Sequence, residues 1–216
     1  MDINSKSWKE KWSENKYPPS NPSYFCTKEY GTDFEPDSSI WCASLLEPVI
    51  EQLQEPFSVL DYGCGNGRLF NFLSRHFKNF TYYGLDTKTN HGIESIKKAK
   101  DFFQHDNRAC FGHEIVPCDL NVFGSVATHI SIELFESILK NLTSSRIGTV
   151  ASFLISDKYY FDHSGLYEDP NCYGHIYYTK EMIESLAFKL NLQFNLKELF
   201  VTKYNDFHYI YNFFSS

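Results

Sequence analysis

The sequence predicts a doubly wound α/β fold, in which helices cover both faces of a mostly parallel sheet. An apolar strand at residues 57–60 runs into an acidic residue and then into three glycines at alternate positions. An amphipathic run at 68–77 follows directly, with leucine and phenylalanine spaced for one helical face. A second strand at 82–85 then ends in another carboxylate. Strand, glycine turn, helix and strand are typical of a βαβ unit that holds a nucleotide-type ligand at the carboxyl end of its first strand.

The glycine turn distinguishes between two classes of cofactor. Glycines lack a Cβ, so the chain can turn sharply and bring bare backbone against a ligand. A dinucleotide fingerprint, Gly-x-Gly-x-x-Gly, requires a third glycine at position 68 or 70, where Arg68 and Phe70 stand. Asp61, just before the turn, would repel a pyrophosphate but suits a ligand that carries an ammonium and a sulfonium centre. Asp86, at the end of the second strand, is placed to accept hydrogen bonds from both hydroxyls of a ribose.

This arrangement resembles the first motif of the class I methyltransferases that use S-adenosylmethionine. The resemblance covers about residues 57–216, with strong motifs at two places and pattern-level agreement elsewhere. It implies S-adenosylmethionine as the cofactor, with Asp61 and the glycine backbone at its methionine end and Asp86 at its ribose. The cofactor-binding residues that it implies are Asp61, Gly63, Cys64, Gly65, Gly67, Leu85, Asp86, Thr87, Asp119 and Leu120.

The third and fourth strands are the least legible part of the sequence. One alignment takes 114–118 as the third strand, so that Asp119 and Leu120 follow it, where members of the family contact the adenine. Another takes 109–111 as the third strand and 114–123 as the fourth. We favour the second alignment slightly for topology, because it leaves the usual strand count intact. The choice decides which residue meets the adenine.

The remaining elements follow from local patterns. Residues 148–155, rich in β-branched and aromatic side chains, predict a fifth strand. A long polar and aromatic loop covers 162–178, and Thr179 is a suitable amino-terminal cap for the next helix. Two strands follow at 193–204 and 208–214. A helix followed by a terminal hairpin resembles the sixth and seventh strands of the same family, so the resemblance implies a seven-stranded sheet whose last strand is antiparallel.

Composition limits the domain organisation and the partners. The 216 residues suffice for one α/β domain, which we place at 57–216, preceded by an amino-terminal appendage at 1–56. The appendage either folds over the site as a cap or packs its aromatic residues against the outside of the core. The formal net charge of −7, without a basic cluster, argues against a large nucleic acid partner. No apolar run is long enough to span a membrane and no signal core is present, so we expect a cytoplasmic protein.

The cysteines and histidines predict neither crosslinks nor a metal. The six cysteines are scattered without a Cys-x-x-Cys pair, and we expect free, mostly buried thiols. The eight histidines show no metal-ligand spacing. Four residues are candidates for the catalytic, acceptor side of the site. His129 follows the fourth strand of the favoured alignment, where some members of the family keep a histidine beside the reacting atom, although it could equally cap a helix. The other three fall in the long loop: His163, Tyr173 and His175.

The predicted function is methyl transfer from S-adenosylmethionine to an oxygen or nitrogen atom of a small molecule, by a monomer or homodimer. The sequence lacks the Asn/Asp-Pro-Pro-Tyr tetrapeptide of enzymes that methylate amino groups of DNA bases. Two alternatives stay open. One is a catalytically silent module that binds S-adenosylmethionine or a partner. The other is an NAD-dependent oxidoreductase, against which Arg68 argues because it replaces the third glycine.

Overall fold

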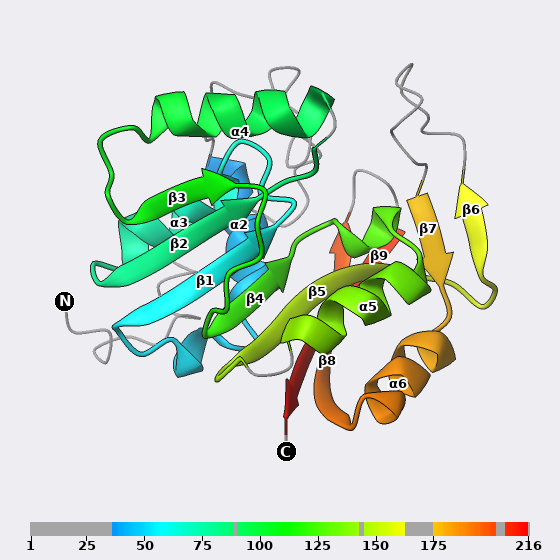
Figure 1. Cartoon of the computed structure of the whole chain (residues 1–216). Coiled ribbons are helices and arrows are strands. Elements are labelled where there is room, and N and C mark those ends of the chain that lie inside the picture. The colour runs from blue at the N-terminus through cyan, green and yellow to red at the C-terminus, as the bar shows by residue number, and fades with distance from the viewer. Residues whose placement is uncertain (1–35, 89, 143–144, 163–174, 202–205, 216) are drawn as a thin grey trace.

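The computed structural model describes residues 36–88, 90–142, 145–162, 175–201 and 206–215, which build one sheet with helices on both faces (Figure 1). The strands are β1 (Phe57–Tyr62), β2 (Phe80–Leu85), β3 (Ala109–Gly112), β4 (Leu120–Phe123), β5 (Gly148–Ile155), β6 (Tyr160–Asp162), β7 (His175–Tyr178), β8 (Leu192–Val201) and β9 (Asp206–Ser215). The α-helices are α2 (Pro36–Leu46), α3 (Arg68–His76), α4 (Asn90–Phe102), α5 (Ile132–Leu142) and α6 (Lys180–Lys189). Two single-turn 3₁₀ helices are η2 (Ile50–Gln52) and η3 (Ala127–His129).

The order of the strands is that of a doubly wound sheet. The run β3-β2-β1-β4-β5 is parallel throughout, and its direction of growth reverses between β1 and β4. Strand β9 lies antiparallel along β5, and β8 lies antiparallel to β9. The predicted fold class, with a mostly parallel sheet and an antiparallel last strand, is therefore confirmed.

A short hairpin, β6–β7, differs from the prediction. The sequence predicted a loop over 162–178, but its two ends pair as strands in the structure. The reason lies on the edge of β5 that pairs with β4, because that pairing ends at Ala151 and leaves the last residues of this edge unpaired. Strand β7 takes up these groups through Leu154 and Ile155, and it buries Ile176 and Tyr178. The sheet thus gains two short strands beyond the expected seven.

The core consists of two apolar layers, one on each face of the sheet. Helices α2, α3 and α4 pack on one face, and α5 and α6 pack on the other. Within α3, the buried side chains are Leu69, Phe70, Phe72 and Leu73, so the helical face predicted from their spacing is confirmed. Helix α6 begins at the predicted cap, because the Thr179 hydroxyl accepts a hydrogen bond from Met182 N at 3.3 Å.

The segment before β1 is part of this core from residue 41 onward. Trp41 and Leu45 of α2 are buried, and Leu46 and Val49 have no exposed surface. A boundary at residue 57 therefore does not separate the described part of the expected appendage from the domain. The expected appendage also includes residues 1–35, which lie outside the described part of the chain. Whether that segment caps the site stays a prediction.

The structure decides between the two alignments of the middle strands. Strand β3 is Ala109–Gly112, and β4 begins at Leu120. The favoured alignment is correct in its strand order, although residues 114–119 form a connection instead of the first half of β4. Strand β4 is short, and it pairs with β1 on one side and with β5 on the other. All four of its residues are buried, the polar Asn121 among them, as expected for a central strand that is covered on both faces.

Several findings apply only to the residues that the structure describes. Cys42, Cys64, Cys110 and Cys118 are free thiols, and all but Cys110 are buried. None of the described helices is long and apolar enough to cross a membrane. Within the same part of the chain, no group of three or more histidines, cysteines and carboxylates is arranged to hold a metal ion.

Candidate cofactor and acceptor site

The candidate site lies at the carboxyl ends of β1 and β4, where the strand order reverses. In open α/β sheets this switch point is the usual place for a ligand, because the loops there diverge to opposite faces and leave a crevice. The glycine turn follows β1 directly, and the connection to η3 follows β4. The two segments touch, since a Cβ on Gly63 would lie 2.1 Å from Val126 Cγ2.

The three glycines adopt left-handed backbone, with φ of +75° at Gly63, +52° at Gly65 and +83° at Gly67. Gly63 and Gly67 also lack room for a side chain, because a Cβ would overlap Val126 in the first case and approach Phe103 to 2.7 Å in the second. At Gly65 a Cβ would meet nothing within 4 Å. The turn is therefore packed at its two ends and open in the middle, where bare backbone can meet a ligand.

Asp86 faces this open part of the turn from the end of β2. Its carboxylate accepts hydrogen bonds from Gly65 N at 2.9 Å and from Thr87 N at 2.7 Å. The backbone of the two strands is also joined, because Gly63 N and Cys64 N both donate to Leu85 O, at 2.7 and 3.0 Å. These predicted cofactor residues therefore form one cluster. Asp86 is partly exposed, and its oxygens can accept further donors from a ligand.

Asp61 belongs to the same cluster but lies beneath the turn. Its side chain is buried and accepts a hydrogen bond from the Tyr82 hydroxyl at 2.5 Å. Burial raises the pKa of Asp61 to about 7, against the opposing effects of the Tyr82 hydrogen bond and the Arg68 charge, while Asp86 adds to the rise. Asp61 therefore places a titratable negative charge under the glycines, and it offers little surface for direct contact.

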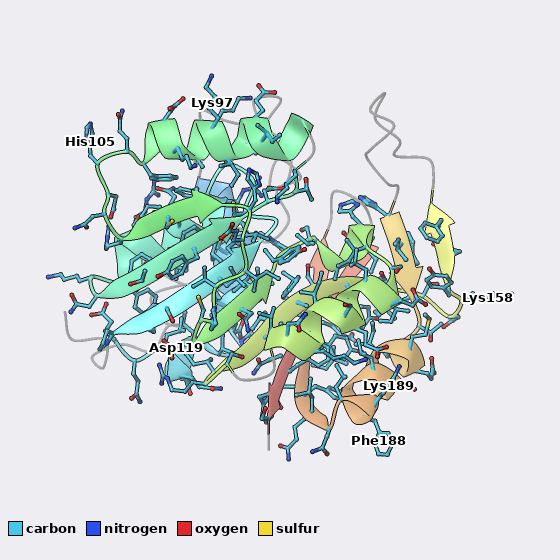
Figure 2. All side chains as sticks on the ribbon, in the orientation of Figure 1. Lys97, His105, Asp119, Lys158, Phe188 and Lys189 are labelled. Carbon is cyan, nitrogen blue, oxygen red and sulfur yellow. The ribbon has the colours of Figure 1, made fainter. Side chains whose placement is uncertain are left out.

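The structure does not place the predicted adenine contacts, Asp119 and Leu120, beside the glycine turn. Leu120 begins β4 and pairs with Val59, the third residue of β1, and Asp119 precedes it, so both lie toward the amino-terminal edge of the parallel strands and away from the turn. Figure 2 shows Asp119 at this lower edge. Its carboxylate accepts hydrogen bonds from Ser58 N at 2.8 Å, Ser58 Oγ at 2.9 Å and Arg146 Nε at 2.9 Å. Partial burial opposes these bonds, which nonetheless lower the pKa of Asp119, so the residue ties β1 to the segment before β5.

His113 lies beside Asp86, and the sequence analysis did not identify it as a candidate site residue. It follows β3, whose carboxyl end lies beside that of β2, and its Nδ1 is 2.9 Å from the Asp86 carbonyl oxygen. A Cβ added to the neighbouring Gly112 would meet nothing within 4 Å, so open space continues along this edge. The signal was present in the favoured alignment, because a third strand ending near residue 111 puts His113 directly after it.

Two of the four predicted acceptor-side residues come together in the structure. His129 ends η3 after β4, and His175 begins β7. Their ring centroids lie 5.1 Å apart, with an angle of 51° between the planes. His163 and Tyr173 lie outside the described residues. The pairing of β7 with the end of β5 brings His175 to this edge, and it could not be read from spacing alone.

Hydrogen bonds fix the segment that carries His129. The Tyr178 hydroxyl donates to Ala127 O at 3.1 Å and lies against Ile130 O, so β7 clamps both ends of η3. Ser125 has left-handed backbone with φ of +62°, and its N–H donates to Ser152 Oγ at 2.8 Å. A non-glycine residue in this conformation costs on the order of 1 kcal/mol, which the surrounding bonds offset.

A surface hollow lies elsewhere on the molecule, and none of the predicted functional residues lines it. It is lined by Gln52, Ser145, Arg146, Ile147, Asn195, Phe214 and Ser215. Arg146 and Ile147 precede β5, so the hollow lies at the amino-terminal edge of the parallel strands. The glycine turn, Asp86 and the two histidines gather at the opposite edge. We place the site there, because chemistry-bearing residues converge at that edge and not at the hollow.

Comparison with known proteins shows the fold. No protein-family model and no curated protein matches the sequence. Among solved structures, the chain is similar to 1,6-didemethyltoxoflavin-N1-methyltransferase of Burkholderia thailandensis with bound 1,6-didemethyltoxoflavin and S-adenosylhomocysteine (TM-score 0.61, 13% identity, 82% of this chain and 80% of that one). It is also similar to magnesium protoporphyrin IX methyltransferase of Synechocystis PCC 6803 with bound S-adenosylhomocysteine (0.60, 16%, 83% and 83%). A third is human N-acetylserotonin methyltransferase in complex with S-adenosylmethionine (0.53, 13%, 83% and 56%).

These three solved structures are methyltransferases, and each holds S-adenosylmethionine or S-adenosylhomocysteine. The fold that they share with this chain is the class I methyltransferase fold. The resemblance to class I methyltransferases, inferred from the glycine turn and Asp86, is therefore confirmed at the level of the fold. The identities of 13–16% carry no substrate across to this chain.

Proposed function

We propose that the protein is an S-adenosylmethionine-dependent methyltransferase that acts on an oxygen or nitrogen atom of a small molecule. The observation that carries the proposal is the pairing of Gly65 with Asp86. A turn that is open only at its middle glycine faces a carboxylate at the end of the next strand. This arrangement matches a ligand with a ribose at one end and a positively charged group at the other.

The residues fit this cofactor in shape and in charge. The empty space above Gly65 would be filled by a side chain at any other residue type, and the Asp86 oxygens can exchange Gly65 N for two ribose hydroxyls. Asp61 and Asp86 give the turn a negative surrounding, which suits ammonium and sulfonium groups and disfavours a pyrophosphate. His113 and Gly112 border the space on the side where an adenine would extend.

The acceptor side of the site would orient the small molecule and provide a side chain that accepts its proton. Bound S-adenosylmethionine supplies a methyl group on a sulfonium, which is already a good leaving group. The chain then has to align the acceptor atom with that methyl and exclude water. His129 and His175 stand next to each other on elements that Tyr178 holds together, so either imidazole can accept a proton from a hydroxyl or an ammonium.

A binding titration followed by a turnover screen tests the proposal. Thermal unfolding is measured with S-adenosylmethionine, S-adenosylhomocysteine and NAD in parallel. A ligand at about 100 times its Kd should stabilise the folded state by about 2.7 kcal/mol. We expect a shift with both adenosyl ligands and none with NAD. Formation of S-adenosylhomocysteine is then followed over a panel of small phenols, carboxylic acids and amines.

The outcomes separate the competing functions. Binding with turnover on at least one acceptor supports the methyltransferase. Binding without turnover on any acceptor supports a silent module, and stabilisation by NAD alone supports the oxidoreductase. An Asp86→Asn variant is the matched control for the site, because it keeps the shape of the side chain and removes its charge. If this variant bound the adenosyl ligands as tightly as the unaltered protein, the proposed site would be wrong.

A further inference from the structure

Tyr82 and Asp61 form a buried pair on neighbouring strands, next to the proposed cofactor site. Asp61 is the fifth residue of β1, and its partner across the β1–β2 ladder is Gly84. Tyr82 precedes Gly84 by two residues, so both Tyr82 and Asp61 project to the face covered by α2 and α3. The Tyr82 hydroxyl reaches diagonally across the ladder and donates to Asp61 Oδ2 at 2.5 Å.

The surroundings hold the Tyr82 ring in one place. The side chain has no exposed surface, and its ring centroid lies 5.2 Å from that of Phe70 and 5.6 Å from that of Phe111. Gly84 leaves the space that the ring needs, because a Cβ there would lie 2.9 Å from Tyr82 Cε1. This packing fixes the Tyr82 ring in the orientation that points its hydroxyl at the Asp61 carboxylate. The separation of 2.5 Å is that of a short O–H···O hydrogen bond.

The other groups near Asp61 leave Tyr82 as its hydrogen-bonding partner in this apolar environment. Arg68 of α3 attracts the carboxylate and Asp86 repels it, and neither bonds to it directly. Cys42 of α2 and Cys64 of the turn are neutral, since burial raises the pKa of Cys42 to about 12 and that of Cys64 still further. Burial also keeps the pKa of Tyr82 well above its usual value, so the phenol stays a donor.

We propose that Tyr82 is a positioning residue, which favours the ionised form of the Asp61 carboxylate and holds it beneath the glycine turn, so that its charge attracts the cationic methionine end of the cofactor. The inference rests on the proposed function and adds a residue to it. Burial favours the neutral acid, and the Tyr82 hydrogen bond favours the anion. Without that bond, Asp61 takes up a proton at a higher pH and the charge under the turn is lost.

Cofactor affinity as a function of pH tests this role. Calorimetric titrations between about pH 5.5 and 8.5 measure the Kd of S-adenosylmethionine for the unaltered protein, Tyr82→Phe and Asp61→Asn. Methylthioadenosine, which keeps the nucleoside and lacks the amino acid and the sulfonium charge, is the second probe. We expect affinity for S-adenosylmethionine to fall about tenfold as Asp61 protonates, with a midpoint near pH 7.

In Tyr82→Phe the midpoint should move upward by about one pH unit, the size expected from a lost hydrogen bond to a charged group. In Asp61→Asn that step should disappear, and methylthioadenosine should show no such step with any of the three proteins. Circular dichroism and thermal unfolding confirm that the variants are folded. Phenylalanine keeps the ring packing, and asparagine keeps an acceptor for the Tyr82 hydroxyl.

Two results would overturn the positioning role while leaving the methyltransferase intact. One is an unchanged midpoint in Tyr82→Phe, which makes Tyr82 a packing residue only. The other is a midpoint that persists in Asp61→Asn, which assigns the titration to another group. Failure of both S-adenosylmethionine and methylthioadenosine to bind the unaltered protein at any pH is a different result. It overturns the proposed function and, with it, this inference.

Discussion

The two halves of the candidate site are built in different ways. On the β1–β2 side, the backbone defines the shape of the site, through left-handed glycines and hydrogen bonds at the strand ends. On the β4–β7 side, the features are side chains, namely two histidines and a tyrosine that clamps their segment. The first half requires glycine at Gly63 and Gly67, where a Cβ would overlap a neighbouring side chain, whereas the second half depends on which side chains its elements carry.

Under the proposed function, this difference would separate cofactor recognition from acceptor recognition. Backbone geometry that suits one ligand can be kept while the side chains at the other end change the acceptor. Loops and strand ends carry such side chains because substitutions there leave the core intact. The solved structures similar to this chain share its fold, while their names give different small molecules.

The largest effect is expected on the acceptor side. His129→Asn and His175→Asn should each leave the Kd of S-adenosylmethionine unchanged, and the substitution that removes the base should lower kcat about 100-fold or more. Steady-state kinetics with an acceptor from the screen measure this. His105→Asn, on the exposed connection after α4 (Figure 2), is the matched control and should be neutral. Full activity in both site variants would show that neither histidine takes part in the reaction.

Loss of the Asp86 carboxylate should weaken cofactor binding, in contrast to the effect on kcat expected for the histidines. Asp86→Asn should weaken the binding of S-adenosylmethionine about 100-fold, because two hydrogen bonds to a charged group are each replaced by a weaker one. Calorimetry measures the Kd, and the exposed Asp101→Asn on α4 is the control. If turnover fell while the Kd stayed the same, Asp86 would belong to the acceptor half and the comparison between the halves would fail.

Asp61 should make the free energy of unfolding depend on pH. Its folded-state pKa of about 7 exceeds the ordinary value of 3.8, so the folded protein binds a proton more tightly than the unfolded chain does. Stability from this group is fully present below about pH 4 and is lost as the pH rises to 7. Asp61→Asn should therefore be more stable than the unaltered protein above pH 7, by on the order of 2 kcal/mol. Urea unfolding at pH 5 and pH 8 measures this, and equal differences at both pH values would contradict it.

The glycines should respond unequally to a methyl group. Gly63→Ala should lower the free energy of unfolding by more than 1 kcal/mol, because its Cβ overlaps Val126 and its backbone is left-handed. Gly65→Ala meets no neighbour, so it should cost only about 1 kcal/mol of stability while weakening cofactor binding about tenfold. Thermal unfolding and calorimetry on both variants distinguish the effects. Equal loss of stability with unaltered binding in Gly65→Ala would place the ligand elsewhere.

Much of the fold could be predicted, because its elements have local signals. The fifth strand at Gly148–Ile155 matches its prediction, and Thr179 caps α6 as expected. The glycine turn and Asp86 were found because left-handed backbone and strand ends leave a mark in the sequence. The role of Asp119 was ambiguous because residues 114–119 are apolar and polar in no regular order, so 114–118 fitted either the third strand or the first part of the fourth.

The acceptor half could be predicted only as a set of candidates. His129 and His175 are 46 residues apart in the sequence, and their contact depends on how β7 extends the edge of β5. The Tyr82–Asp61 bond is equally nonlocal, since it requires the register in which Gly84 faces Asp61. Neither register follows from the residues themselves, because period-two patterns fit several pairings until the sheet is assembled.

A crystal structure of the protein with S-adenosylhomocysteine would show whether the glycine turn and Asp86 form the cofactor site. We expect the ligand at the carboxyl ends of β1 and β2, with both ribose hydroxyls about 3 Å from the Asp86 carboxylate. We also expect the homocysteine backbone over Gly65 and the adenine beside His113. Ligand bound at another edge of the sheet, or ribose hydroxyls without a contact to Asp86, would contradict the proposed site.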